Sequence, residues 1–211
     1  MIQIKICGIT RPRDALDAAE AGVDALGFIF HEPSPRSILP VKAREIIALL
    51  PSRIVRVGVF VNSPVERIKE IADVCGLDII QLHGDESADY CRHFAPESVV
   101  KAVFLKSYED IIRLEPYRVR AFLADSREGG RYGGTGRTSD WAAAGAVARR
   151  FPLILAGGLS ETNLAEALAA VRPAAVDLNS GVETAPGVKD VERIKRAVAI
   201  VKNADIFSTA E

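Results

Sequence analysis

The chain has 211 residues, with 27 lysines and arginines, 28 aspartates and glutamates, and a net charge of -1. This length suits one well-packed domain, and the balanced charge argues against partners such as nucleic acid or an anionic membrane. Cys7, Cys75 and Cys91 are odd in number and form no C-x-x-C pair, which argues against a disulfide framework and a thiolate zinc site. We expect a cytoplasmic protein, because no signal pattern or membrane-spanning apolar run is visible.

The first strand is expected over residues 2–6, where isoleucines alternate with polar residues, and Cys7 follows it. Because side chains alternate along a strand, Cys7 shares a face with Lys5, and the isoleucines share the other face. If the polar face looks into a barrel, a thiol and an ammonium group lie together at its mouth. Taken alone, Cys7 is more often a small buried hydrophobe.

Short apolar strands alternate with amphipathic helical stretches along the rest of the chain. Thr10, Ser63 and Ser160 are the expected caps of three of the helices. The later strands are expected over residues 25–30, 54–61, 77–82, 99–104, 121–124, 153–156 and 175–178, and the helices over 12–21, 43–50, 63–74, 87–94, 108–114, 141–150, 160–170 and 190–201.

Eight strand-then-helix units in 211 residues predict a single (β/α)8 TIM barrel of minimal size over residues 1–203, followed by a polar tail over 204–211. A doubly wound sheet is the alternative. It usually has fewer strands, and no G-x-G-x-x-G motif follows an early strand here. In a barrel the active site lies at the carboxyl ends of the strands, so each strand end can be searched for functional side chains.

Glycines follow the last two predicted strands, in Gly157-Gly158 and in Ser180-Gly181. Backbone amides without side chains can approach an anion closely, so two such loops side by side predict a phosphate site. Tight turns are the ordinary explanation for the glycines of each loop on their own. The glycine-rich stretch 133–136 is ambiguous, because it could line the same site or form a loop over it.

Four other strand ends or loops carry polar side chains that could act on a substrate. Asp125 ends the sixth strand on the same face as two apolar residues expected to point inward. An ordinary aspartic acid is ionised at pH 7, so a general acid at this position needs desolvation or the anionic groups of the substrate. Arg36 offers a forked donor suited to a carboxylate. His83 and Asp177 are further inward candidates, although a hydrogen-bonded histidine and a structural carboxylate are both common.

Six short segments that contain or flank these residues follow one another nearly from one end of the chain to the other. They are Lys5–Thr10, Ser34–Arg36, Gln81–Gly84, Gly133–Gly136 with Trp141, Leu155–Leu159 and Ser180–Glu183. Taken together they resemble the phosphoribosylanthranilate isomerase family of tryptophan biosynthesis. One departure is Asn179, where a small residue is expected. The resemblance implies an aldose-ketose isomerase that converts N-(5-phosphoribosyl)anthranilate to 1-(2-carboxyphenylamino)-1-deoxyribulose 5-phosphate by an Amadori rearrangement.

The resemblance also implies roles for several of the candidate residues, while the individual roles of His83 and Asp177 stay open. Asp125 would be the general acid and Cys7 the general base, and no metal or cofactor would be needed for two proton transfers. Because a free thiol is only slightly ionised at neutral pH, we expect Lys5 to favour the thiolate. The expected substrate-binding residues are Arg36, which would bind the anthranilate carboxylate, His83, Gly134, Gly136, Gly157, Gly158, Asp177, Ser180 and Gly181.

Two rival functions remain at this point. The first is the related ProFAR isomerase of histidine biosynthesis, for which carboxylates are expected at the ends of strands one and six. Strand one here ends in Cys7, which argues against this rival. A non-catalytic phosphosugar-binding barrel would keep the phosphate loops but has no reason to keep both Cys7 and Asp125. The sequence leaves open whether the protein is a monomer or a homodimer.

Overall fold

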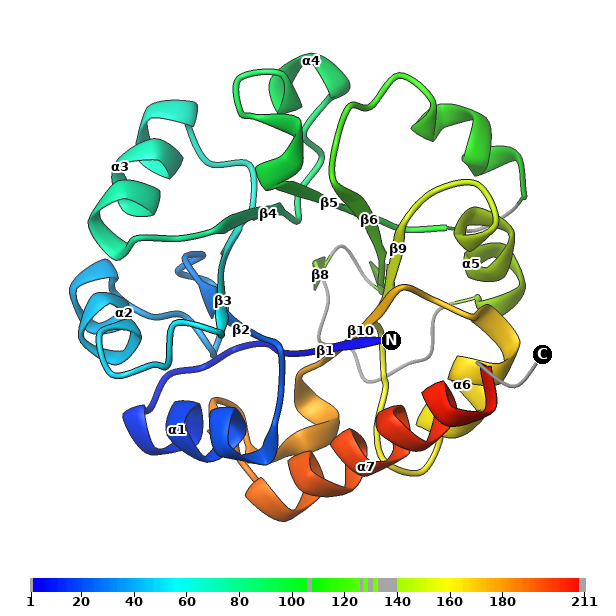
Figure 1. Ribbon diagram of the computed structural model, residues 1–211. Helices are drawn as coiled ribbons and strands as arrows, with labels where there is room; N and C mark the ends of the chain where they lie inside the picture. Colours follow the sequence, from blue (N-terminus) through cyan, green and yellow to red (C-terminus); the bar gives the residue numbers. More distant parts are fainter. Residues whose placement is uncertain (1, 106–107, 126, 129–130, 133–139, 209–211) are drawn as a thin grey trace.

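The computed structural model describes residues 2–105, 108–125, 127–128, 131–132 and 140–208. The barrel strands are β1 (Gln3–Ile6), β2 (Ala25–Ile29), β3 (Val55–Phe60), β4 (Ile79–Leu82), β5 (Val99–Val103), β6 (Ala121–Ala124), β9 (Leu153–Leu155) and β10 (Ala175–Leu178). They close into a parallel barrel in the order β1-β10-β9-β6-β5-β4-β3-β2 (Figure 1). The predicted TIM barrel is confirmed, and the open doubly wound sheet is excluded.

Helices surround the barrel on its outside (Figure 1). The 3-10 helix η2 (Tyr108–Leu114) lies between β5 and β6, and in it Ile111 and Leu114 are buried and Ile112 is exposed. Buried positions three residues apart suit the three-residue period of a 3-10 helix. The helices are α1 (Pro12–Ala21), α2 (Pro40–Ile47), α3 (Val65–Cys75), α4 (Ala88–Cys91), α5 (Trp141–Ala148), α6 (Leu164–Val171), α7 (Val191–Ser208), η1 (Pro96–Ser98), η2 (Tyr108–Leu114) and η3 (Ser180–Val182).

The strands divide the apolar core into two layers. On β1, Ile4 and Ile6 belong to the layer between barrel and helices, while Lys5 and Cys7 face the barrel interior, where Lys5 meets a side chain of β10. A smaller inner layer fills the barrel below the strand ends and includes Leu123. The alternation read from the sequence therefore sets which side chains reach the site.

Three expected helix caps are wrong, because each position has another partner or lies too early. Thr10 donates its hydroxyl to Gly187 O at 2.6 Å instead of capping α1. Helix α3 begins after Pro64, so Ser63 lies one position too early. Ser160 precedes a turn closed by Asn163, whose Oδ1 accepts from the Ser160 amide at 2.9 Å, and α6 starts only at Leu164.

The last helix is longer than predicted. It continues past residue 201 to Ser208, so part of the stretch expected as a polar tail is helical. The sequence of this stretch contains no glycine or proline that would end a helix. Among the described residues, no helix is long and apolar enough to cross a membrane.

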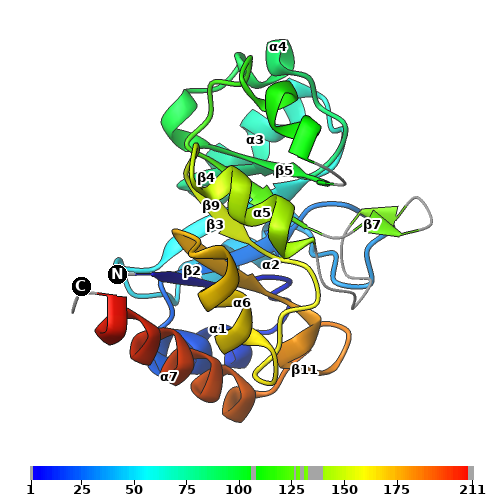
Figure 2. The same ribbon diagram turned by 90° about the vertical axis from the view of Figure 1, so that its right-hand side faces the viewer.

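Two small hairpins follow the carboxyl ends of barrel strands. They are β7 (Arg127–Glu128) with β8 (Arg131–Tyr132), after β6, and β11 (Glu183–Ala185) with β12 (Val188–Lys189), after β10. Figure 2 shows β7 and β11 on the side of the barrel opposite to both chain ends. This side is the catalytic face of a TIM barrel.

Candidate active site

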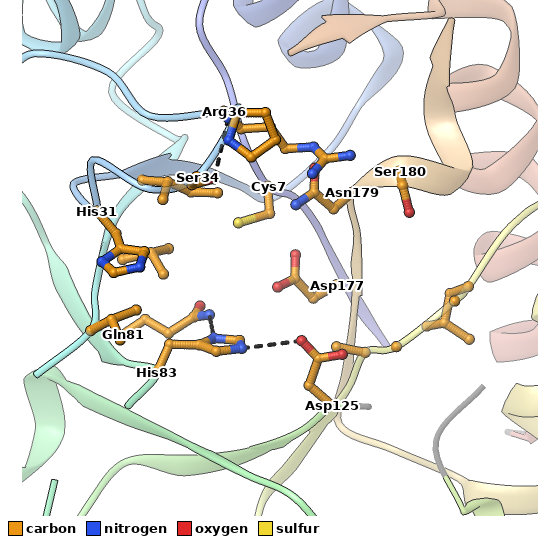
Figure 3. Close-up of a pocket in the computed structure, with 18 of the residues that line it drawn as sticks. Cys7, His31, Ser34, Arg36, Gln81, His83, Asp125, Asp177, Asn179 and Ser180 are labelled. Carbon is orange, nitrogen blue, oxygen red and sulfur yellow. Dashed lines mark hydrogen bonds and ion pairs between the residues drawn. The ribbon is translucent and has the colours of Figure 1, made fainter. Parts of the chain in front are cut away.

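A cavity of about 580 Å³ opens at the carboxyl ends of the strands. Figure 3 shows Cys7 and Asp125 on opposite sides of it, with Asp177 between them. Its wall is formed by residues of β2, β3, β4 and β10 and by the loops that follow β1, β2, β3, β4, β6, β9 and β10. The lining residues include Cys7, His31, Ser34, Arg36, Gln81, His83, Asp125, Gly157, Gly158, Asp177, Asn179 and Ser180.

Cys7 shares the barrel interior with a buried ion pair. Lys5 Nζ lies 2.6 Å from Asp177 Oδ2, on the neighbouring strand β10. The other carboxylate oxygen, Asp177 Oδ1, is buried without a hydrogen-bond partner among the described residues. Asp177 lines the cavity, so this oxygen is an unused hydrogen-bond acceptor at the edge of the site.

The environment of the thiol works against its ionisation. Burial raises the pKa of Cys7, Lys5 acts in the opposite direction, and Asp177 raises the pKa further. Burial also acts to lower the pKa of Lys5, but the attraction of Asp177 and Cys7 outweighs it, so Lys5 stays charged. Lys5 therefore lies beside the thiol as expected, yet the net result is a thiol pKa above its ordinary value.

Gly27 on β2 makes room for this cluster. A Cβ atom built there would lie 2.8 Å from Cys7 Sγ and 3.1 Å from Lys5 Nζ. Real Cβ atoms essentially never come within 3.0 Å of another heavy atom, so a larger residue would displace the sulfur and crowd the ammonium group. The sulfur and the ammonium thus share one small space over the glycine.

Asp125 is connected to β4 by two hydrogen bonds in series. Gln81 Nε2 lies 2.9 Å from His83 Nδ1, and His83 Nε2 lies 3.1 Å from Asp125 Oδ2 (Figure 3). With the amide of Gln81 donating to Nδ1, the proton of a neutral imidazole sits on Nε2 and points to Asp125. Gln81 is a site residue that the sequence analysis missed, although it lies two positions before His83, on the same strand face.

The guanidinium of Arg36 is held by a carboxylate of the chain itself. Glu183 Oε2 accepts from Nη2 at 2.7 Å, and both carboxylate oxygens lie 3.0 Å from Nε. Lys189 Nζ binds the same carboxylate at 2.7 Å and also reaches Asn179 Oδ1 at 3.0 Å. Glu183, Lys189 and Asn179 were not among the predicted site residues. The contact that ties them to Arg36 spans 147 positions, and no local pattern reveals it.

The two glycine loops after β9 and β10 lie together. Gly157 and Gly158 line the cavity with φ angles of 82° and 62°, which L side chains rarely adopt. Ser180 lines it from the other loop. Gly181 has a packing role, since a Cβ atom there would lie 2.0 Å from Leu159 O. The close contact of the loops requires this glycine.

Most of the predicted site residues are in one place. The structure brings Cys7, Arg36, His83, Asp125 and Asp177 together around the cavity, with the lining glycines and Ser180. The predicted residues Gly134 and Gly136 lie outside the described part of the chain. Cys75 and Cys91 are buried away from the cavity, as expected for packing residues.

A closed (β/α)8 barrel with acidic, basic and thiol groups at one mouth defines a single-chain barrel enzyme equipped for proton transfer. The family model for N-(5'-phosphoribosyl)anthranilate isomerase matches residues 4–200. The chain belongs to this family, and the resemblance found in the sequence is confirmed.

Individual relatives agree with this assignment. The N-(5'-phosphoribosyl)anthranilate isomerase of Syntrophus aciditrophicus is 54% identical over 96% of this chain and 88% of its own. The crystal structure of phosphoribosyl anthranilate isomerase from Thermotoga maritima is 43% identical, with a TM-score of 0.89 over 96% of this chain and 100% of that one. A crystal structure of a phosphoribosyl anthranilate isomerase in complex with reduced 1-(o-carboxyphenylamino)-1-deoxyribulose 5-phosphate is 40% identical, with a TM-score of 0.85 and coverage of 96% and 100%.

Proposed function

We propose that this isomerase of tryptophan biosynthesis converts N-(5-phosphoribosyl)anthranilate to 1-(2-carboxyphenylamino)-1-deoxyribulose 5-phosphate, with Asp125 as general acid and Cys7 as general base. The observation that carries the proposal is the position of both side chains in the wall of one cavity. Cys7 follows β1 and Asp125 follows β6, and the strands β10 and β9 lie between β1 and β6 in the barrel. A sugar held between Asp125 and Cys7 can meet the acid on one side and the base on the other.

The reaction begins at the furanose ring. Asp125 gives a proton to the ring oxygen, the bond from that oxygen to C1 breaks, and the nitrogen lone pair forms the C=N bond of a protonated imine. Its positive charge makes the C2–H bond acidic and favours the Cys7 thiolate over the thiol. Cys7 then takes the C2 proton, and the electron pair of the C–H bond neutralises the imine. The resulting enolamine tautomerises to the ketone.

The rest of the site holds the two anionic ends of the substrate. Arg36 binds the anthranilate carboxylate through the part of its guanidinium that Glu183 leaves unused. Backbone amides of the loops at Gly157-Gly158 and Ser180 bind the phosphate. His83 orients the carboxyl group of Asp125. These contacts fix the ring oxygen and C2 at opposite sides of the cavity.

The test is turnover, followed by the loss of anthranilate fluorescence when purified protein meets freshly formed phosphoribosylanthranilate. We expect Cys7→Ala and Asp125→Ala to lower kcat by about 10²- to 10⁴-fold each, the usual contribution of a general acid or base. Cys75→Ala and Asp89→Ala are matched controls, because Cys75 lies in α3 and Asp89 is exposed in α4. Full activity of both site variants contradicts the assigned roles, and no turnover by the wild type contradicts the reaction.

A further inference from the structure

Glu183 is a buried carboxylate that the reaction steps above do not use. It lies at the start of β11, three positions after the cavity residue Ser180, and is 7% exposed. Its two oxygens accept from Arg36, from Lys189 Nζ at 2.7 Å and from the Gly187 amide at 3.1 Å. One carboxylate therefore serves two buried cations at the edge of the site, which leaves a net positive charge there.

The contact with Arg36 fixes how its guanidinium can meet a ligand. An arginine has five N–H donors arranged around a rigid plane. Nε and one hydrogen of Nη2 point to Glu183. Nη1 and the second hydrogen of Nη2 make no hydrogen bond to any described residue, and Arg36 lines the cavity. Glu183 thus selects which edge of the fork remains for a second carboxylate.

The same carboxylate is tied to the loop after β10. Lys189 Nζ joins Glu183 Oε1 to Asn179, with distances of 3.0 Å to Oδ1 and 3.3 Å to the carbonyl oxygen. Gly8 leaves room for both Asn179 and Arg36, since a Cβ atom there would lie 2.8 Å from Asn179 Oδ1 and 2.9 Å from Arg36 Cδ. Arg36, Glu183, Lys189 and Asn179 therefore form one connected unit.

Glu183 is charged in this unit, and its single negative charge orients Arg36 without cancelling the positive charge of both Arg36 and Lys189. Burial acts to raise the pKa of Glu183, but the hydrogen bonds from Arg36 and Lys189 outweigh it, so the pKa lies below its usual range. Glu183 remains an anion beside two cations. Its removal would leave Lys189 with only the oxygens of Asn179 among the described residues, and Arg36 would lose the contact that holds its plane.

We propose that Glu183 is a positioning residue, which holds the guanidinium of Arg36 with one edge turned to the cavity and thereby sets the preference for a substrate carrying a carboxylate. This inference rests on the proposed function, because it takes the anthranilate carboxylate as the group that Arg36 binds. Glu183 does not touch the reacting atoms, so it acts on substrate affinity and selection rather than on proton transfer.

The test compares two unreactive ligands that differ in one group. These are the reduced product 1-(2-carboxyphenylamino)-1-deoxyribitol 5-phosphate and its phenyl analogue, which lacks the carboxylate. In Glu183→Gln we expect the preference for the carboxylated ligand to fall about tenfold, with the phenyl analogue bound within about threefold of wild type. KM for the substrate rises by a similar factor, while kcat changes little. Glu70→Gln, in an exposed pair with Arg67, is the control.

Glu183→Asp tests the same inference if Glu183→Gln does not fold. It keeps the negative charge between Arg36 and Lys189 but shortens the side chain by one methylene, so the preference should still fall. An unchanged preference in either folded variant overturns the inference, as does an equal loss of affinity for both ligands, which indicates a structural role. Absence of turnover by the wild type contradicts the proposed function instead, and the ligand preference is measured without turnover.

Discussion

His83 Nε2 lies 3.1 Å from Asp125 Oδ2, across the strand β5 that separates β4 from β6. The imidazole is held from behind by Gln81, whose amide reaches Nδ1 at 2.9 Å. Asp125 is thus aimed at the cavity by a side chain that is itself fixed. An acid with a fixed orientation can deliver its proton to one oxygen of the substrate without a search for the reactive geometry.

Replacement of His83 should slow proton transfer rather than substrate binding. In His83→Ala we expect kcat to fall by about 10- to 100-fold, less than for loss of Asp125 itself, with KM nearly unchanged. The measurement is steady-state turnover. His93→Ala is the control, because His93 is exposed and contacts only Tyr90 among the ring pairs of the described residues. A large rise in KM without a change in kcat contradicts an orienting role.

The ionisation of Cys7 should respond with opposite sign to the loss of Lys5 and to the loss of Asp177. Burial raises the pKa of the thiol, Lys5 lowers it and Asp177 raises it. The thiolate is the form that alkylates, so the midpoint of the pH profile for alkylation should move to higher pH in Lys5→Met and to lower pH in Asp177→Asn. Iodoacetamide labelling, read from the Cys7 peptide by mass spectrometry, gives both midpoints. An unchanged midpoint in Lys5→Met counts against electrostatic control by Lys5.

Gly27→Ala should destabilise the protein by crowding the side chain of Cys7. The new methyl group would lie 2.8 Å from Cys7 Sγ, so we expect a loss of about 1–3 kcal/mol in the free energy of unfolding, as for other overpacked cores. Urea unfolding measures this loss. In a Cys7→Ala background the same change should destabilise less, because the sulfur is gone. Equal losses in both backgrounds would show that the sulfur is not the obstacle.

Lys101 should be a major source of stability near the site. Its Nζ atom, on β5, lies 3.0 Å from Glu86 Oε2 and also donates to the carbonyl oxygens of Leu82, Gly84 and Ala102. Removal of one member of a buried ion pair destabilises by about 3–5 kcal/mol, and we expect this range for Lys101→Met in urea unfolding. Lys42→Met, in an exposed pair with Glu45, should change stability by less than about 1 kcal/mol.

Much of the fold could be predicted because its signals are local. The alternation of Ile4 and Ile6 with Lys5 and Cys7 set the two faces of β1, and eight such strands followed by helical stretches indicated a barrel. The capping residues of α1 and α6, expected at Thr10 and Ser160, could not be predicted in this way. Their side chains or amides have partners that come from turns and from a distant hairpin, and a cap motif carries no information about such partners.

The sequence by itself determined the barrel, the strand ends that carry Cys7 and Asp125, and the family. Only the tertiary structure decided which side chains pair: Lys5 with Asp177, His83 with Asp125 and Arg36 with Glu183, at separations of 172, 42 and 147 positions. The register of β1 against β10 places Lys5 opposite Asp177. Such pairs form because barrel closure brings distant strand ends within hydrogen-bond distance, and hydrogen bonds depend on a few tenths of an ångström that no local pattern encodes.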